Sequence, residues 1–325
     1  MFKFIKLYIK SMRLYYAFLT GIPGWIGVSF YIHIATNYKT VEIIPSTGKK
    51  TIILLLLFLS WGINQIINDF LGLKEDRINA PERPMVTGEL NPVIALIVSA
   101  VLIIVTGFVT WFYLEPIAII PLLIGVFANI IYEYAKGYGI MGNIVFGFMI
   151  MMCPVYGFLA SGPIAPPYFT SSRVSVLLII WVINGIMTYY TYFKDYRGDK
   201  ITGKNTLVVK LGIKNAKIFG IIIAFLPAIL FLFVYYNNFI MNRANQVFIL
   251  LGLLSIILQV GTGILFFRNP SGIQAYNLLS VNFRACTGSQ AALIALYDKE
   301  LALILYLFSY VFISIFFHFY DNPKA

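Results

Sequence analysis

The sequence predicts an all-α integral membrane protein, a single polytopic domain over residues 1–325 with nine transmembrane helices. Of the 325 residues, 60% are hydrophobic and 11% are charged, and the mean hydropathy is +0.84. Soluble domains carry about 25% charged residues. The apolar residues also gather in nine runs that can form helices across a bilayer core, which takes about 20 residues. A water-soluble domain is therefore excluded.

The nine apolar runs follow one another along the chain. A further stretch, 273–297, is more polar, and we expect it to include an interfacial or partly inserted helix. No small-residue cleavage site follows the basic N-terminal stretch, so we do not expect a removed signal peptide. The nine expected helices cover residues 14–35, 51–70, 92–113, 116–132, 142–161, 174–194, 217–236, 247–267 and 300–319.

Lysine and arginine residues predict the orientation in the membrane. With the N-terminus inside, the inner segments hold 18 of the 24 basic residues and the outer segments hold six. The positive-inside rule then places the N-terminus and the loops at 68–91 and 194–216 in the cytoplasm and the C-terminus outside. The length of 194–217 explains part of this asymmetry. The net charge of +11 is scattered between apolar runs, so we expect membrane lipid rather than nucleic acid as a partner.

Seven of the thirteen carboxylates fall in two stretches, 69–89 and 195–199, on the predicted cytoplasmic side. Asp195 and Asp199 are four residues apart and share a helix face, and Asp69 is seven before Asp76. Like charges this close repel unless a cation lies between them. The two cysteines and two histidines cannot form a zinc cluster, and oxygen ligands favour Mg²⁺. Because these acids lie at span ends, a purely structural role stays open.

Basic residues accompany both acidic stretches. Mg²⁺ takes its remaining ligands from water and from substrate phosphates, and cations beside it can neutralise phosphate oxygens as a leaving group departs. Contact with anionic lipid is the alternative for each of them except Lys194, which directly precedes Asp195. The basic residues are Arg77, Arg83, Lys194, Arg197, Lys200 and Lys204.

The two acidic stretches lie in the segments NDFLGLKEDRINAPERPMVTG (68–88) and YTYFKDYRGDKITGKNT (190–206). These segments resemble, in this order, the first and the second signature of the UbiA superfamily of intramembrane prenyltransferases. YEYAK (132–136) looks like the YxxxK element of the fourth helix, and Arg13 also has a counterpart. The resemblance implies a nine-helix bundle around a central cavity that binds an isoprenyl diphosphate.

The resemblance also implies roles for individual residues. Mg²⁺ on the diphosphate would be held by Asn68, Asp69, Asp76, Asp195 and Asp199, with Asp76, Asp195 and Asp199 as the catalytic acids. The diphosphate itself would contact Arg83, Tyr132, Lys136, Tyr190 and Lys194.

Gly72 departs from the family pattern, because it stands where prenyltransferases of this family usually carry the middle Asp. The resulting NxxxGxxxD pattern resembles the UbiA-type (class IB) terpene synthases, which cyclise the isoprenoid. Aromatic residues, 17% of the chain, could stabilise a carbocation, although aromatic belts are ordinary in membrane proteins and a glycine can simply allow close packing. With Gly72 as the specificity residue, the sequence favours cyclisation of a C15–C20 diphosphate.

Two alternatives stay open. The first is prenyl transfer to an aromatic, quinone-precursor or lipid acceptor, which would need a group that accepts the acceptor's proton. The second and more distant alternative is an anion transporter. Transporters usually place acids near the bilayer midplane in symmetric halves, whereas here the acids lie at the ends of two spans.

Overall fold

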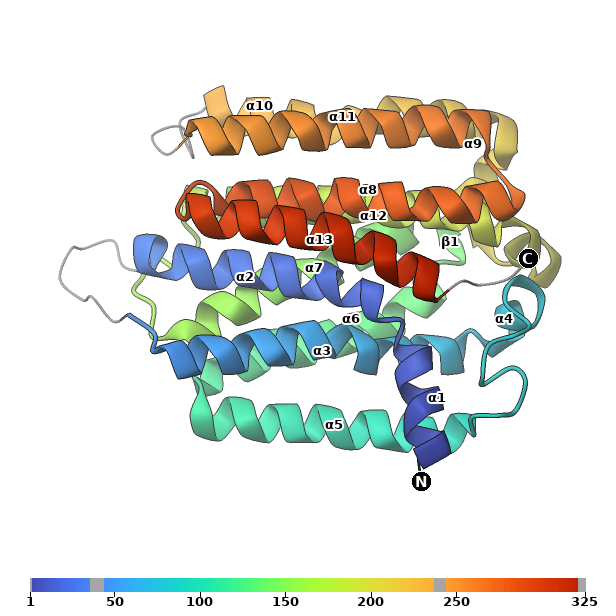
Figure 1. Cartoon of the computed structure of the whole chain (residues 1–325), viewed down its shortest axis with the longest axis horizontal. Helices are drawn as coiled ribbons and strands as arrows, with labels where there is room; N and C mark the ends of the chain where they lie inside the picture. Colours follow the sequence, from blue (N-terminus) through green and yellow to red (C-terminus); the bar gives the residue numbers. More distant parts are fainter. Residues whose placement is uncertain (1, 36–43, 237–243, 321–325) are drawn as a thin grey trace.

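The structure is a computed structural model that describes residues 2–35, 44–236 and 244–320. It consists mainly of long apolar helices (Figure 1), several of which start after a small polar N-cap residue. Ser46, Asn91 and Thr170 each accept a hydrogen bond from a backbone N–H in the first turn of the helix that follows. The long helices are α2 (Ala17–Ile34), α3 (Thr47–Leu71), α5 (Pro92–Tyr113), α6 (Ile119–Ala135), α7 (Ile140–Ser161), α8 (Ser171–Thr202), α9 (Leu207–Ala224), α11 (Gln246–Arg268), α12 (Gly272–Ile294) and α13 (Lys299–Phe319).

Short elements join these helices. The shorter helices are α1 (Phe2–Met12), α4 (Leu73–Asn79) and α10 (Leu226–Tyr236), with 3₁₀ turns η1 (Leu14–Tyr16) and η2 (Pro116–Ala118). The strands β1 (Tyr138–Gly139) and β2 (Asn205–Thr206) pair in parallel, so the segment after α6 is joined to the segment after α8.

Within the described part of the chain, nine helices are long and apolar enough to cross a membrane, as the sequence predicted. The span expected at 174–194 belongs to α8, which continues to Thr202, and the span expected at 217–236 lies in α9 and α10. The protein is an all-α integral membrane protein that crosses the membrane several times.

Side chains on the outside of the bundle are apolar, while polar side chains face inward. On α5, Ile97, Ile104 and Phe108 are more than half exposed, whereas Ser99 and Thr110 are fully buried. Ser99 hydrogen bonds to the hydroxyl of Tyr8 at 2.7 Å, and Thr110 to that of Tyr156 at 2.8 Å. This arrangement suits a lipid solvent, because a polar group has no partner in hydrocarbon.

α12 corrects the expectation of an interfacial or partly inserted helix at 273–297. It runs along the bundle beside α8 and α13, and it buries Asn282, Thr287 and Gln290 completely (Figure 1). The amide of Asn282 donates to the carbonyl of Met187 on α8 at 2.9 Å. Its polar residues lower the hydropathy of the segment, so it was not recognised as a helix of the bundle. In the structure these residues are buried against neighbouring helices and not exposed to water.

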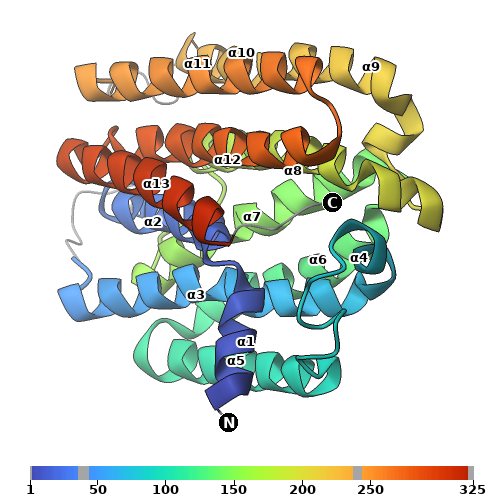
Figure 2. The ribbon, with the colours of Figure 1, turned by 45° about the vertical axis from the view of Figure 1, so that its right-hand side comes forward.

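Because α12 runs along the bundle, α13 ends at a different end of the bundle from the one that the sequence predicted. Tyr297, just before α13, stacks on His33 at the end of α2 with ring centroids 4.2 Å apart, and Phe317 lies 4.2 Å from Tyr15 before the start of α2. α13 is therefore antiparallel to α2 and ends where α2 begins (Figures 1 and 2). The sequence predicted an N-terminus and a C-terminus on opposite sides of the membrane. Among the described residues, Tyr15 and Phe317 lie at the same end of the bundle. Which end of the bundle faces the cytoplasm stays a prediction.

Candidate active site

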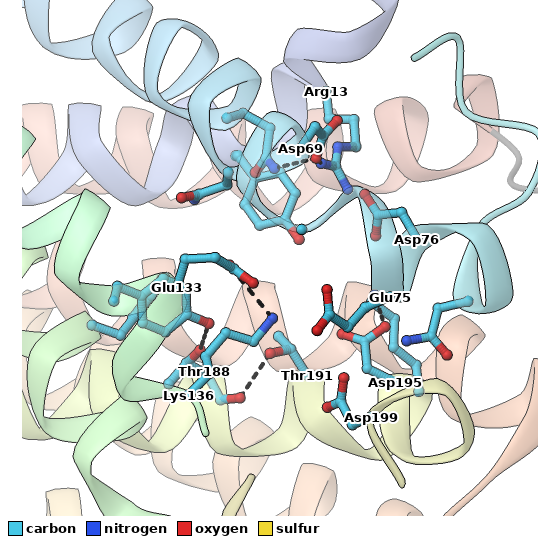
Figure 3. A pocket seen from close by; sticks show the side chains of 18 of the residues that line it. Arg13, Asp69, Glu75, Asp76, Glu133, Lys136, Thr188, Thr191, Asp195 and Asp199 are labelled. Atoms are coloured by element: carbon cyan, nitrogen blue, oxygen red, sulfur yellow. Dashed lines mark hydrogen bonds and ion pairs between the residues drawn. The ribbon is translucent and has the colours of Figure 1, made fainter. Parts of the chain in front are cut away.

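A charged cavity lies at the end of the bundle where α3, α6 and α8 terminate (Figure 3). Its deeper wall is largely apolar and aromatic and includes Tyr16, Trp61, Phe146 and Met187. The remaining wall carries six carboxylates, from Asp69, Glu75, Asp76, Glu133, Asp195 and Asp199. Polar chemistry at the mouth thus adjoins an apolar interior.

The first pair of predicted acids shares one arginine. α3 ends at Leu71 and α4 begins at Leu73, yet Asp69 and Asp76 both reach the guanidinium of Arg83, with 3.3 Å between Arg83 Nη1 and Asp69 Oδ1. Asp69 also pairs with Arg13, a left-handed residue (φ 48°) between α1 and η1. This unusual backbone position turns the Arg13 side chain into the cavity.

The second pair lies on the last two turns of α8. Asp195 Oδ1 is 2.5 Å from the ammonium of Lys194. Asp199 is 1% exposed, and neither of its carboxylate oxygens has a hydrogen-bond partner among the described residues. A buried carboxylate without a partner costs several kcal/mol. Both oxygens of Asp199 are therefore available to a ligand.

A third charged group was missed from the sequence. Glu133 near the end of α6 pairs with Lys204 and lies 3.8 Å from Lys136, and Glu75 lies 3.5 Å from Lys204. The β1–β2 pair holds the segments that carry Lys136 and Lys204 together. The available signal was a carboxylate in an otherwise apolar span, which is uncommon in membrane helices.

The structure brings nearly all of the predicted site residues into this one cavity. Besides the aspartates, it is lined by Asn68, Gly72, Arg83, Tyr132, Lys136 and Lys194. Tyr190 is the exception, because its hydroxyl donates to the carbonyl of Gly220 at 2.6 Å and its ring packs on Phe266. Tyr190 faces α9 and α11, so its expected contact with a diphosphate is wrong. Thr188 and Thr191 line the cavity from α8 in its place.

The donors in the cavity fit a magnesium ion shared with a phosphate. Across the described ranges, no three His, Cys, Asp or Glu side chains form a ready-made metal cage. Mg²⁺ seldom uses one, since it takes one or two carboxylates together with water and substrate phosphates. The oxygens of Asp199 and Oδ1 of Asn68 are buried and have no partner in the part of the chain that the structure describes. These are the hard oxygen donors that such an ion prefers.

Metal binding should weaken in acid. Burial raises the pKa of Asp76 to about 6, Arg83 opposes this shift, and the charge of Asp69 adds to it. Below pH 6 the carboxyl therefore holds a proton that a metal must displace, and we expect Mn²⁺ affinity to fall about tenfold per pH unit. Electron paramagnetic resonance titration from pH 5 to pH 8 measures this. A constant affinity across that range would contradict the assignment of Asp76.

The fold and this cavity define an integral membrane enzyme whose polar site lies at one end of a helical bundle. Residues 41–286, more than half of the chain, match the UbiA prenyltransferase family. The chain belongs to this family.

Relatives and solved structures agree with this family. Digeranylgeranylglyceryl phosphate synthase of Sulfolobus acidocaldarius is 28% identical over 225 residues, 67% of this chain and 74% of the relative. The enzyme of the same name from Thermococcus sibiricus is 27% identical over 223 residues, with 67% and 73% covered. A UbiA homologue from Archaeoglobus fulgidus bound to GPP and Mg²⁺ superposes with a TM-score of 0.62 at 14% identity, covering 95% of this chain and 99% of that one. The apo UbiA homologue from Aeropyrum pernix gives 0.64 at 12% identity, covering 88% and 96%.

Proposed function

We propose that this enzyme transfers an isoprenyl group from an isoprenyl diphosphate to a lipid acceptor, with Mg²⁺ as cofactor. The observation that carries this proposal is the cavity in which Asp69 and Asp76 lie across from Asp195 and Asp199 (Figure 3). Cations lie beside both pairs, and aromatic residues line the same cavity. The relatives named digeranylgeranylglyceryl phosphate synthase support transfer over the cyclisation that the sequence favoured.

Breaking the allylic C–O bond sends its electron pair to the departing diphosphate. Mg²⁺ supplies positive charge that stabilises this leaving group when it is bound. Arg83, Lys136 and Lys194 line the same cavity and can neutralise further phosphate oxygens. The allylic cation left behind faces Tyr16, Trp61 and Phe146, whose ring faces attract positive charge. Attack by the oxygen of an acceptor hydroxyl on the allylic carbon forms the new C–O bond, and the hydroxyl proton passes to the released diphosphate.

A second groove offers an approach for the acceptor. This groove is lined by both apolar and basic residues of α1, and it shares Arg13, Asp69 and Arg83 with the charged cavity. Its apolar residues include Phe2 and Ile9, and its basic ones include Lys6 and Lys10. A groove of this composition suits a lipid whose tail stays apolar while its polar head reaches the site.

The experiment supplies purified protein with Mg²⁺ and a C15 or C20 diphosphate, with and without an acceptor. One acceptor is geranylgeranylglyceryl phosphate. It has one geranylgeranyl group fewer than the digeranylgeranylglyceryl phosphate after which the relatives are named. The other acceptor is a hydroxybenzoate. We expect diphosphate release that depends on the lipid acceptor, together with a prenylated lipid by mass spectrometry. Transfer to the hydroxybenzoate alone would overturn the acceptor class.

Cyclisation is tested by the sample without acceptor. A cyclic hydrocarbon or terpene alcohol formed at the rate of diphosphate release would restore the terpene synthase interpretation and contradict transfer. Diphosphate release only in the presence of acceptor would contradict cyclisation. Any Mg²⁺-dependent release also counts against an anion transporter.

A further inference from the structure

We propose that Glu133 on α6 supplies the carboxylate that the first motif lacks at Gly72, so that a metal ligand has moved from one helix to its neighbour. This inference rests on the proposed diphosphate chemistry. It assigns a role to a residue outside both acidic motifs.

The space beside Gly72 is already occupied by a carboxylate. A Cβ atom built on Gly72 would lie 3.3 Å from Oε1 of Glu133 and 3.7 Å from its Cδ. Glu133 is 7% exposed, and it lines the cavity together with Gly72 (Figure 3). The side chain of an aspartate at 72 would therefore begin directly beside the carboxylate of Glu133. The negative charge is kept, although the residue that carries it is 61 positions further along the chain.

An independent observation points to a cation between these groups. Asp199 lines the same cavity with both carboxylate oxygens buried and unpaired within the described ranges, as does Asn68 with its Oδ1. Glu133 itself is neutralised by Lys204 and Lys136. A diphosphate that arrives with Mg²⁺ offers phosphate oxygens to these lysines and a cation to Glu133. The ion pairs between Glu133 and the two lysines can thus break without leaving a buried charge unpaired, because the metal replaces the lysines at Glu133 and the phosphate replaces Glu133 at the lysines.

This placement changes what Gly72 implies. The pattern NxxxGxxxD was interpreted as the loss of a carboxylate and hence as a mark of cyclisation. If Glu133 takes over the position, the cavity keeps its full set of acids, and glycine is present because a side chain at 72 would crowd Glu133. Gly72 and Glu133 then form one functional unit.

The test is an exchange of the carboxylate between the two positions. Mn²⁺ binding in the presence of inorganic diphosphate is measured by electron paramagnetic resonance for wild type, Glu133→Gln, Gly72→Asp and the Gly72→Asp/Glu133→Gln double variant. We expect Glu133→Gln to weaken Mn²⁺ binding about 10- to 100-fold, and the double variant to recover most of that loss. Gly72→Asp alone should also weaken binding, because its side chain meets Glu133.

Two further variants separate this role from others. Glu89→Gln removes an exposed carboxylate of the loop after α4 and should bind Mn²⁺ like wild type. If Glu133 only anchors Lys204, then adding Glu133→Gln to Lys204→Met should weaken Mn²⁺ binding no further, and this result would overturn the inference. Glu133→Asp keeps the charge with a shorter side chain, so it should give an intermediate affinity and covers the case in which Glu133→Gln fails to fold.

The failures can be told apart. If wild type binds no Mn²⁺ with diphosphate, the proposed function itself fails. If wild type binds Mn²⁺ and Glu133→Gln binds it equally well, or if the double variant recovers nothing, only the role of Glu133 is overturned.

Discussion

Replacing Asp199 by Asn should abolish turnover and at the same time raise the melting temperature of the metal-free protein. The carboxylate is 1% exposed and neither oxygen has a partner among the described residues, so its charge opposes folding until a cation arrives. Removing it relieves that cost, in the way that active-site residues often oppose stability. We expect turnover to fall at least about 100-fold.

Turnover is measured as diphosphate release, and stability as the melting temperature in detergent without Mg²⁺. Adding Mg²⁺ and diphosphate should stabilise wild type much more than Asp199→Asn, because ligand binding raises the stability of the folded state. A variant that melts below wild type without metal would show that Asp199 contributes to packing. A variant that keeps its turnover would remove it from the metal site.

Replacing Arg83 by Met should cost both activity and stability. Arg83 pairs with Asp76 and with Asp69 and is largely buried, so its loss leaves buried carboxylates facing each other without that cation. Breaking a buried ion pair from one side costs about 3–5 kcal/mol. We expect a lower melting temperature together with a loss of turnover of about 100-fold or more.

A second substitution separates the two effects of Arg83. Asp76→Asn added to Arg83→Met removes one of the stranded charges and should recover part of the melting temperature while turnover stays lost. Arg77→Met, on the exposed side of α4, is the matched control and should change neither. Wild-type turnover in Arg83→Met would contradict its role beside the diphosphate.

The sequence predicted most of the membrane helices and of the site because both depend on regular spacing. Hydropathy identifies a helix that faces lipid, and α12 escaped it because its buried Asn282, Thr287 and Gln290 face protein. Spacing by four placed Asp195 and Asp199 together on the last turns of α8. The same regularity assigned Tyr190 wrongly, since a motif position does not say which neighbour a side chain will find.

Glu133 could not be assigned from spacing at all. Its proximity to Gly72 depends on how α6 packs beside the end of α3, and such contacts between helices distant in sequence appear only in three dimensions. Its position one residue after Tyr132 gave it no motif role of its own.

The left-handed residue Arg13 connects α1 to the charged cavity. α1 lies across the direction of α2 (Figures 1 and 2), and the guanidinium of Arg13, between these two helices, forms an ion pair with Asp69. A change in the tilt of α1 would therefore move the Arg13 guanidinium away from Asp69 and change the electrostatic potential at the diphosphate site.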